Sequence, residues 1–516
     1  MTAEKPANRL FGSVLDRRVM LGALVLSVIY AAFVIWRASA SSFYTLDDPY
    51  IHMALAENIA RGHYGVNLKE VSNPSSSVLW PFLLVVFNWL GLIVWAPLVI
   101  NIASFVLTLR LLAAFAVDRL SPGRNPTNAL VFTGLAALAF NLFGVIFTGM
   151  EHSLHTLFSV AAITRVIDRR YNLIALIALI VSPLLRFEGA AILAFGIAMA
   201  LYDRKFRFAA ISAGVTVICF GAYFAGLHAL GLPMLPSSVL AKSAVSSSVV
   251  DGGSMFSSVL AQAEANRVTD YAPVFFLIEL AFAWAIFRRR GRDRMLAAGF
   301  FVLTAAAFAL GKMNSYSRYE VYILCVLLIG AIQLYSTVLQ FVMRWMIAAI
   351  ALGLALSAVS NFSGMQIVGN TPMAARNIDR QQHQMHRLVT ECWRAPIAVN
   401  DLGWVSFRND LYVLDLGGLG NEEARKAGAA GEPGWEGRLL TEHHVEAAAI
   451  YTDWFGKLSA DWIKVGDLVL DDQRITPAGD TVTFYATNAS AAARLGGCLT
   501  ELGKSLPVGA SVRIGG

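Results

Sequence analysis

Charged residues are scarce in this chain of 516 residues. Only 15% of the residues are Asp, Glu, Lys or Arg, whereas 56% are hydrophobic, and the mean hydropathy is +0.58. Soluble domains carry about 25% charged residues, so this composition excludes an ordinary soluble protein. Internal repeats and low-complexity tracts are also lacking, apart from a Ser/Gly-rich stretch at 243–258. The chain is predicted to be a polytopic α-helical membrane protein.

Cysteine is rare as well, with four residues in the chain. Cys219 and Cys325 fall in apolar stretches, whereas Cys392 and Cys498 lie in the polar C-terminal part. On the topology predicted below, that part faces an oxidising compartment. A disulfide between Cys392 and Cys498 and a pair of free thiols are therefore both open.

Basic clusters predict the orientation in the membrane, because they resist translocation. The first apolar stretch, Val19 to Trp36, follows Arg17 and Arg18, so the N-terminus is expected in the cytoplasm. A secretory signal peptide ending near Ala38-Ser-Ala40 is the alternative, although the apolar run is longer than the usual h-region. Later clusters recur after every second apolar stretch, at Arg119 with Arg124, 165–170, 204–207, 288–294 and Arg344.

This pattern predicts about eleven transmembrane helices within residues 1–360 and an outward-facing C-terminus. The stretch from Trp80 to Trp89 is not counted, because a span there would move the later arginine clusters outside. It is expected to lie along the interface, within a first outer loop at 39–94. The expected spans are 19–38, 95–117, 128–147, 152–167, 172–186, 188–202, 207–228, 271–287, 295–311, 319–337 and 343–360.

The composition changes after about residue 360, where charges, glycines and turn residues return. A helix is predicted over 377–390, and buried strands over 395–399, 411–416, 447–451 and 482–485. Strands that alternate with helices are typical of a small α/β domain. Residues 361–516 are therefore predicted to form a soluble α/β domain on the outer, periplasmic face.

The outer loops carry the polar residues that could perform chemistry. The run Tyr44-Thr-Leu-Asp47-Asp48-Pro-Tyr50-Ile-His52 follows the first apolar stretch. Adjacent carboxylates near lipid persist where a cation, a donor network or chemistry uses them. A general base beside cations suits attack by a hydroxyl on a carbon whose leaving group is a phosphate. The other outer loops supply Glu151, His152, Arg186, Glu188, Lys242, Lys312, Arg318 and Glu320.

The order of several short motifs resembles the GT-C superfamily of polytopic glycosyltransferases, in its arabinofuranosyltransferase-like and mannosyltransferase-like branches. The resemblance covers about residues 19–360 and extends weakly into Ala398-Val-Asn400-Asp401-Leu-Gly403. Phe187 stands where relatives often have proline. The motifs are Leu46 to Asn58, Gly65-Val-Asn67, Ser72 to Trp80, Thr148-Gly-Met-Glu151, Leu185-Arg186-Phe-Glu188-Gly189, Leu235 to Lys242 and Ser317-Arg318-Tyr319.

The resemblance implies a role for each candidate site residue. Asp47 would be the base that deprotonates the acceptor hydroxyl, with Asp48 in support. No cofactor is required, but some relatives use a divalent cation, for which Asp48 and Glu151 are the candidate ligands. Lys242, Arg318 and Arg186 would bind the donor phosphate, and Tyr50, His52, Asn73 and Glu151 would support the substrates.

Structural roles for the same residues stay open. Asp48 precedes Pro49 and suits the start of a helix as a capping residue. Arg186 suits an ion pair with Glu188 or Glu151. Lys242 and Arg318 suit interfacial cations that reach toward lipid headgroups.

The resemblance implies a membrane glycosyltransferase, of the inverting type, that moves a sugar from a polyprenyl-phosphate donor to a glycan, lipid or protein acceptor. It is expected in the bacterial inner membrane, acting at the outer face among membrane lipids and without a nucleic-acid partner. The alternative is a transporter or lipid flippase of the envelope-glycan pathway. The position of the charges separates the two, because a transporter places them near the bilayer midplane.

Overall fold

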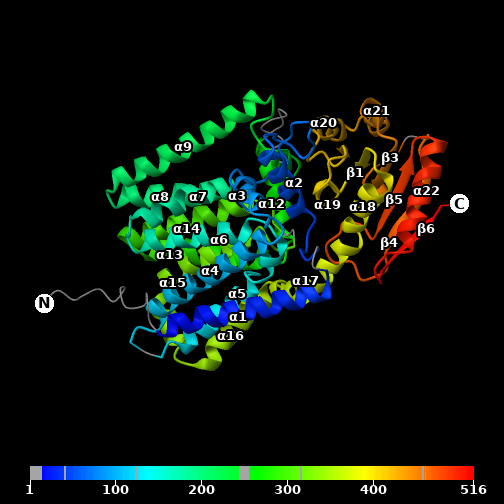
Figure 1. Cartoon of the computed structure of the whole chain (residues 1–516). Helices are drawn as coiled ribbons and strands as arrows, with labels where there is room; N and C mark the ends of the chain where they lie inside the picture. Colours follow the sequence, from blue (N-terminus) through cyan, green and yellow to red (C-terminus); the bar gives the residue numbers. More distant parts are fainter. Residues whose placement is uncertain are drawn as a thin grey trace.

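A computed structural model describes residues 14–39, 42–123, 125–242, 255–313, 316–455, 458 and 461–515. Figure 1 shows a helical part on one side and a domain with a β-sheet on the other, joined by α17 (Ser363–Arg380). Most of the Ser/Gly-rich stretch, residues 243–254, lies outside the described residues. The predicted combination of a helical part with several apolar helices and a C-terminal domain with a sheet is confirmed.

Ten of the eleven expected spans coincide with one helix each, and 128–147 holds α5 and η2, but the expected number of spans is not confirmed. Among the described residues, six helices are long and apolar enough to cross a membrane, or up to eight if each of two bent pairs is one span. The helices of this part are α1 (Val14–Arg37), α2 (Asp48–Ala60), α3 (Trp80–Trp89), α4 (Ala96–Leu120), α5 (Thr127–Ala139), η2 (Gly144–Thr148), α6 (His152–Ile167), α7 (Leu173–Leu185), α8 (Gly189–Tyr202), α9 (Phe206–Ala229), α10 (Ser237–Lys242), α12 (Met255–Arg267), α13 (Ala272–Arg288), α14 (Gly291–Leu310), α15 (Val321–Val342) and α16 (Met346–Val359).

Three consecutive helices that were expected to be spans are too short to cross a membrane. Helices α6, α7 and α8 have 16, 13 and 14 residues. At about 1.5 Å per residue they fall short of a hydrocarbon core of about 30 Å. Helix α3 packs against α2 and α4 as part of the first outer loop.

The C-terminal domain holds a six-stranded sheet of order β2-β1-β3-β5-β4-β6. The first three strands are parallel neighbours, and the others pair antiparallel. Four of the strands fall where the sequence predicts them, whereas β4 and β6 were not predicted. The elements are α18 (Gln382–Arg387), η3 (Leu388–Trp393), β1 (Ile397–Val399), α19 (Gly403–Ser406), β2 (Val413–Asp415), α20 (Glu422–Ala430), α21 (Trp435–Glu442), β3 (Ala447–Ile450), η4 (Thr452–Trp454), β4 (Ile463–Leu470), β5 (Thr481–Ala486), α22 (Ala489–Gly503) and β6 (Ala510–Ile514).

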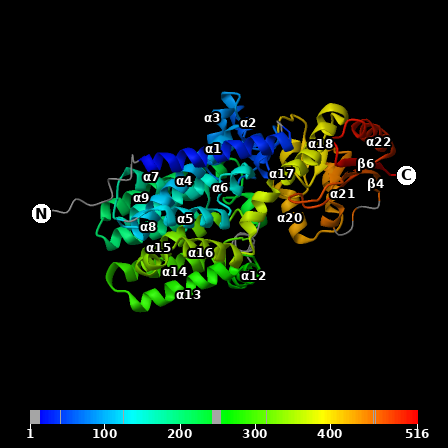
Figure 2. The ribbon, with the colours of Figure 1, turned by 90° about the horizontal axis from the view of Figure 1, so that it is seen from below.

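The first outer loop is attached to an edge of this sheet. The side chain of Asn67 donates to the carbonyl oxygen of Val413 and accepts from its amide, each at 2.9 Å. It therefore occupies backbone groups of β2, the strand at the edge of the sheet, which an open edge would leave unpaired. Helix α17 makes a second attachment, because it packs against α1 and α5 and leads directly into α18 (Figure 2).

Cys392 and Cys498 form a disulfide that links η3 to α22. Of the two states left open by the sequence, the structure therefore has the cross-linked one. The bond closes a segment with a sequence separation of 106 residues.

Replacing both cysteines by serine is expected to destabilise the C-terminal domain by roughly 2–4 kcal/mol, because a long closed loop removes entropy from the unfolded chain. Thermal unfolding of the full chain in detergent, with and without reductant, measures the loss. Equal melting temperatures for the wild type and the double variant would contradict a stabilising cross-link.

Candidate functional site

Asp47 is bound by the C-terminal domain. Its two carboxylate oxygens accept hydrogen bonds from the backbone amides of Gly403, at 2.6 Å, and Trp404, at 2.8 Å. Its exposed fraction is only 8%. A β-carbon on Gly403 would lie 2.1 Å from the backbone oxygen of Asp47. Only glycine therefore lets the two segments approach this closely.

A third carboxyl group joins this contact. Asp401 lies two residues before Gly403 and accepts hydrogen bonds from Gln382, at 2.7 Å, and from the hydroxyl of Tyr451, at 3.1 Å. Burial raises the pKa of Asp47 well above its usual range, and the charge of Asp401 raises it further. Burial likewise raises the pKa of Asp401. The junction therefore favours retention of a proton on these carboxyl groups.

Aromatic rings enclose the same contact. Trp404 stacks on Tyr50 with ring centroids 4.3 Å apart, and its indole N–H donates to Ser42 at 3.0 Å. His383 and His386 of α18 lie against the other side of this junction, with centroids 4.6 and 5.2 Å from Trp404. Tyr50 is fully buried, so the structure places this predicted substrate residue in the domain junction.

Asp48 points into different surroundings from its neighbour. Its carboxylate pairs with Arg318 at 2.6 Å, and 24% of its side chain is exposed. Arg318 is buried, yet its Nε and Nη1 atoms have no hydrogen-bond partner among the residues that the structure describes. A buried guanidinium with spare donors is costly unless an acceptor from outside fills the gap.

Arg186 lies in a buried ion cluster. It contacts Glu151 at 2.7 Å and Glu188 at 2.8 Å, and Ser76 donates to Glu151 at 3.2 Å. The structure therefore shows the ion-pair role that the sequence left open for Arg186. The ring of Tyr319 connects this cluster to Arg318, because the two guanidinium carbons lie 4.9 and 5.0 Å from its centroid.

A cavity of about 310 Å³ opens beside the ion cluster. Residues of four interhelical segments line it together with apolar residues of α14 and α15. Its volume lies at the lower end of the range for small-molecule sites. The residues that line it include Ser76, Arg186, Phe187, Glu188, Ser238, Val239, Leu303, Ala306, Ala307, Leu310, Lys312, Tyr319 and Tyr322.

Three predicted site residues remain, which are His52, Asn73 and Lys242. His52 contacts the hydroxyl of Ser75 at 3.1 Å. The amide of Asn73 links the hydroxyls of Tyr64 and Tyr223, each at 2.9 Å, so it braces the first outer loop against α9. Lys242 ends α10, but its side chain lies outside the described part of the chain.

The two candidate metal ligands do not fit a metal site. Asp48 pairs with Arg318, and Glu151 pairs with Arg186. Within the described ranges, no group of three or more His, Cys, Asp or Glu side chains is arranged to hold a metal ion. We therefore assign no metal-binding role to either carboxylate.

Asp401, Gly403 and Trp404 were not predicted as site residues. The weak extension of the family resemblance over residues 398–403 was the sequence signal for Asp401 and Gly403, and it stops before Trp404. Backbone amides have no side-chain signature, so the contact between Asp47 and the C-terminal domain could not be read from residue types.

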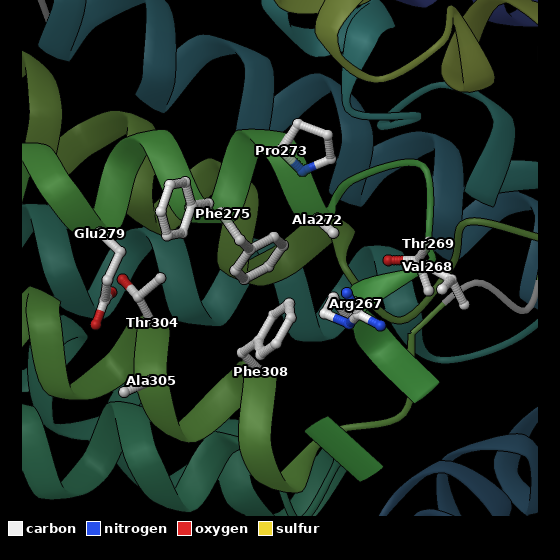
Figure 3. Close-up of a pocket in the computed structure, with 11 residues that line it drawn as sticks. Arg267, Val268, Thr269, Ala272, Pro273, Phe275, Glu279, Thr304, Ala305 and Phe308 are labelled. Carbon is white, nitrogen blue, oxygen red and sulfur yellow. The ribbon is translucent and has the colours of Figure 1, made fainter. Parts of the chain in front are cut away.

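A second cavity, of about 650 Å³, lies between the bend of α12 and α13 and the helix α14 (Figure 3). Phe275 and Phe308 project into it, and Glu279 lies beside Thr304 at one end. Its walls are mainly apolar and offer few groups for chemistry. It is therefore not the candidate active site.

Comparisons with known proteins were informative about the fold. Residues 376–485 match the model of a family described as a domain of unknown function (DUF8728). No curated protein matches the sequence. The crystal structure of the Archaeoglobus fulgidus oligosaccharyltransferase, in complex with Zn and sulfate, has a similar fold, with a TM-score of 0.51 and 12% identity. The likeness covers 95% of this chain and 74% of that chain, and shows a shared fold.

Replacing Gly403 by alanine is expected to separate Asp47 from the C-terminal domain, because the new methyl group overlaps Asp47. Overpacking of this kind costs roughly 1–3 kcal/mol. Limited proteolysis of the full chain measures how easily the domain is released.

Gly497→Ala is the matched control, since a β-carbon at that position of α22 meets nothing within 4 Å. The control should keep or slightly raise the stability. If Gly403→Ala and Gly497→Ala release the domain at the same rate as wild type, the contact with Asp47 does not hold the domain.

Proposed function

We propose that this protein is a GT-C membrane glycosyltransferase. It moves a sugar from a polyprenyl-phosphate donor to a glycan, lipid or protein acceptor at the outer face of a bacterial inner membrane. The arabinofuranosyltransferase-like or mannosyltransferase-like branch is part of this proposal, as is the outward position of the C-terminal domain. The fold likeness and the membrane-length helices support the general class.

The observation that carries the proposal is that Arg318 is buried with nitrogens unpaired in the described part of the chain. Its guanidinium is buried beside the Asp48 carboxylate and has two nitrogens without partners among the described residues. Phosphate oxygens are strong acceptors for such donors and match the charge of arginine. A donor phosphate near Arg318 would satisfy the nitrogens that the protein leaves open.

The cavity beside Tyr319 offers a place for the rest of the donor. Lys312 and Arg186 add positive charge at one end, while Leu303, Ala306 and Leu310 of α14 form an apolar wall. A lipid carrier has the same two parts, an anionic head and an apolar tail. We propose that the head binds at the charged end and the tail follows α14 into the membrane.

Asp47 would act as the base. Each amide of Gly403 and Trp404 takes one acceptor position on one carboxylate oxygen, and each oxygen keeps a second. The acceptor hydroxyl would give its proton to Asp47 as its oxygen bonds to the anomeric carbon. The bond from this carbon to the phosphate oxygen breaks, and the phosphate leaves with the electron pair toward the cations. Attack opposite the leaving group inverts the anomeric centre.

A transporter or flippase is the rival function. A transporter would be expected to place its ionisable residues near the membrane midplane. The Arg186 and Arg318 clusters instead lie in turns between helices, at 186–188 and 316–320. The turn at 316–320 joins α14 and α15, which are both long enough to cross a membrane, so a place for Arg318 near one membrane face favours the enzyme.

Asp47→Asn is expected to reduce sugar transfer about 10²- to 10⁴-fold while donor binding is retained, because the change removes the base but little volume. The measurement is turnover of reconstituted protein with a panel of polyprenyl-phosphate sugars and mixed glycan acceptors. Equal turnover of the two proteins would rule out Asp47 as the base. Failure of wild type to bind any such donor would favour the transporter.

Arg318→Gln is expected to weaken the binding of a polyprenyl phosphate by at least about tenfold, because a charged hydrogen bond contributes roughly 1.5–3 kcal/mol. Titration of the reconstituted protein with the lipid gives the dissociation constants. Arg438→Gln is the control, since Arg438 forms exposed ion pairs on α21, away from the site. Equal weakening in both variants would indicate a general charge effect and remove Arg318 from the site.

A further inference from the structure

Two carboxyl groups from different parts of the chain meet at the junction. Asp47 comes from the first outer loop, and Asp401 follows β1 in the C-terminal domain. Gly403, two residues after Asp401, donates its amide to Asp47 at 2.6 Å, so the backbone brings the two carboxyl groups next to each other. The remaining contacts of Asp401 come from Gln382 and Tyr451, which hold it from within its own domain.

We propose that Asp47 and Asp401 form a carboxyl dyad that shares one proton across the junction, so that the C-terminal domain controls the charge of the base. The proposal rests on the proposed function for its catalytic part. Asp401 is a positioning residue here, because it acts on the substrate through Asp47.

A shared proton follows from the arrangement of donors and acceptors. Two ionised carboxylates cannot hydrogen-bond to each other, because both are acceptors. In a buried site their repulsion is relieved when one of them is protonated. The pair then carries a single negative charge, which the amides of Gly403 and Trp404 stabilise on the Asp47 side.

The other titratable groups around the pair do not replace Asp401. Asp48 is paired with Arg318, which offsets its charge. Tyr50 and Tyr451 are buried, and the pKa of Tyr451 is raised by burial and by the nearby carboxylates, so it stays protonated. His383 and His386 contact the ring of Trp404, and burial lowers the pKa of His386 to about 4, which keeps it neutral.

The dyad has a consequence for proton transfer during the reaction. The singly charged pair can take the proton of the acceptor substrate's hydroxyl at Asp47. Both carboxyl groups are then protonated, and the pair is neutral. The pair must release that proton before the next turnover, when the product and the phosphate have left. Docking of the C-terminal domain brings Asp401 to Asp47 and so sets the pH range in which the base works.

The first test needs no substrate. A proton retained by the folded pair raises its pKa above the unfolded value of about 4, so stability is present below that pH and is lost as the pH rises through the folded pKa. Melting temperatures of the full chain are measured from pH 4 to pH 8 in wild type, Asp47→Asn, Asp401→Asn and the double variant. Both single variants should lose less stability than wild type as the pH rises, and the double variant should resemble them.

Asp480→Asn is the control, because Asp480 lies exposed on the same domain and, among the described residues, its side chain accepts only from the neighbouring Thr481. It should follow the wild-type curve. Identical pH dependence in wild type and all variants would overturn the dyad. Where Asp401→Asn fails to fold, Asp401→Glu keeps the carboxyl group and should restore the wild-type dependence if the proton is shared.

The second test uses sugar transfer. Removing the charge of Asp401 should move the acid limb of the pH profile of kcat to lower pH by about one unit, because Asp47 then ionises more readily. A lower kcat with an unmoved limb would mean a purely structural role and would overturn the proposal. Stability curves that show the dyad, together with no turnover on any donor, would instead refute the proposed function and leave the shared proton in place.

Discussion

The contact between the Asp47 carboxylate and the backbone amides of Gly403 and Trp404 is the interaction on which the candidate site depends. It fixes a charged loop residue at a buried position and ties the loop to a domain more than 350 residues later in the chain. Charge-assisted hydrogen bonds to two amides are stronger than neutral ones. The lack of a side chain at residue 403 makes the approach possible, and Trp404 stacks on Tyr50 beside it.

Charge balance explains why the neighbouring acids behave differently. Asp48 and Glu151 each lie against an arginine, so their charges are offset within a few ångströms. Asp47 has no such cation among its described contacts and relies on amide dipoles and on Asp401. A base held by dipoles remains able to accept a proton, whereas a carboxylate in a buried ion pair would lose the pair by doing so. In the proposed function, Arg318 would therefore bind the phosphate and Asp47 would take the proton, each in its own surroundings.

The sequence predicts the parts of this site whose chemistry lies in side chains. The adjacent acids, the outer-loop cations and the change in composition near residue 360 are all visible as residue types. The sequence could not choose between ion pairing and phosphate binding for Arg186, because Glu151 lies 35 positions away. Strand β4 was missed because a register shift at Gly466 interrupts its pattern. The expected stretches 172–186 and 188–202 agree with α7 and α8 to within one residue, so the error lay in counting such short helices as full spans.

Two faces of helix α14 line two different cavities. Leu303, Ala306 and Leu310 line the cavity with the charged end, whereas Thr304, Ala305 and Phe308 line the apolar cavity. Residues three and four positions apart share a face of a helix, so the two sets occupy different faces. Asn266 fixes the end of α14 through the carbonyl oxygens of Phe308 and Gly311. Because Lys312 follows this fixed end, the bend between α12 and α13 also determines where that cation stands in the polar cavity.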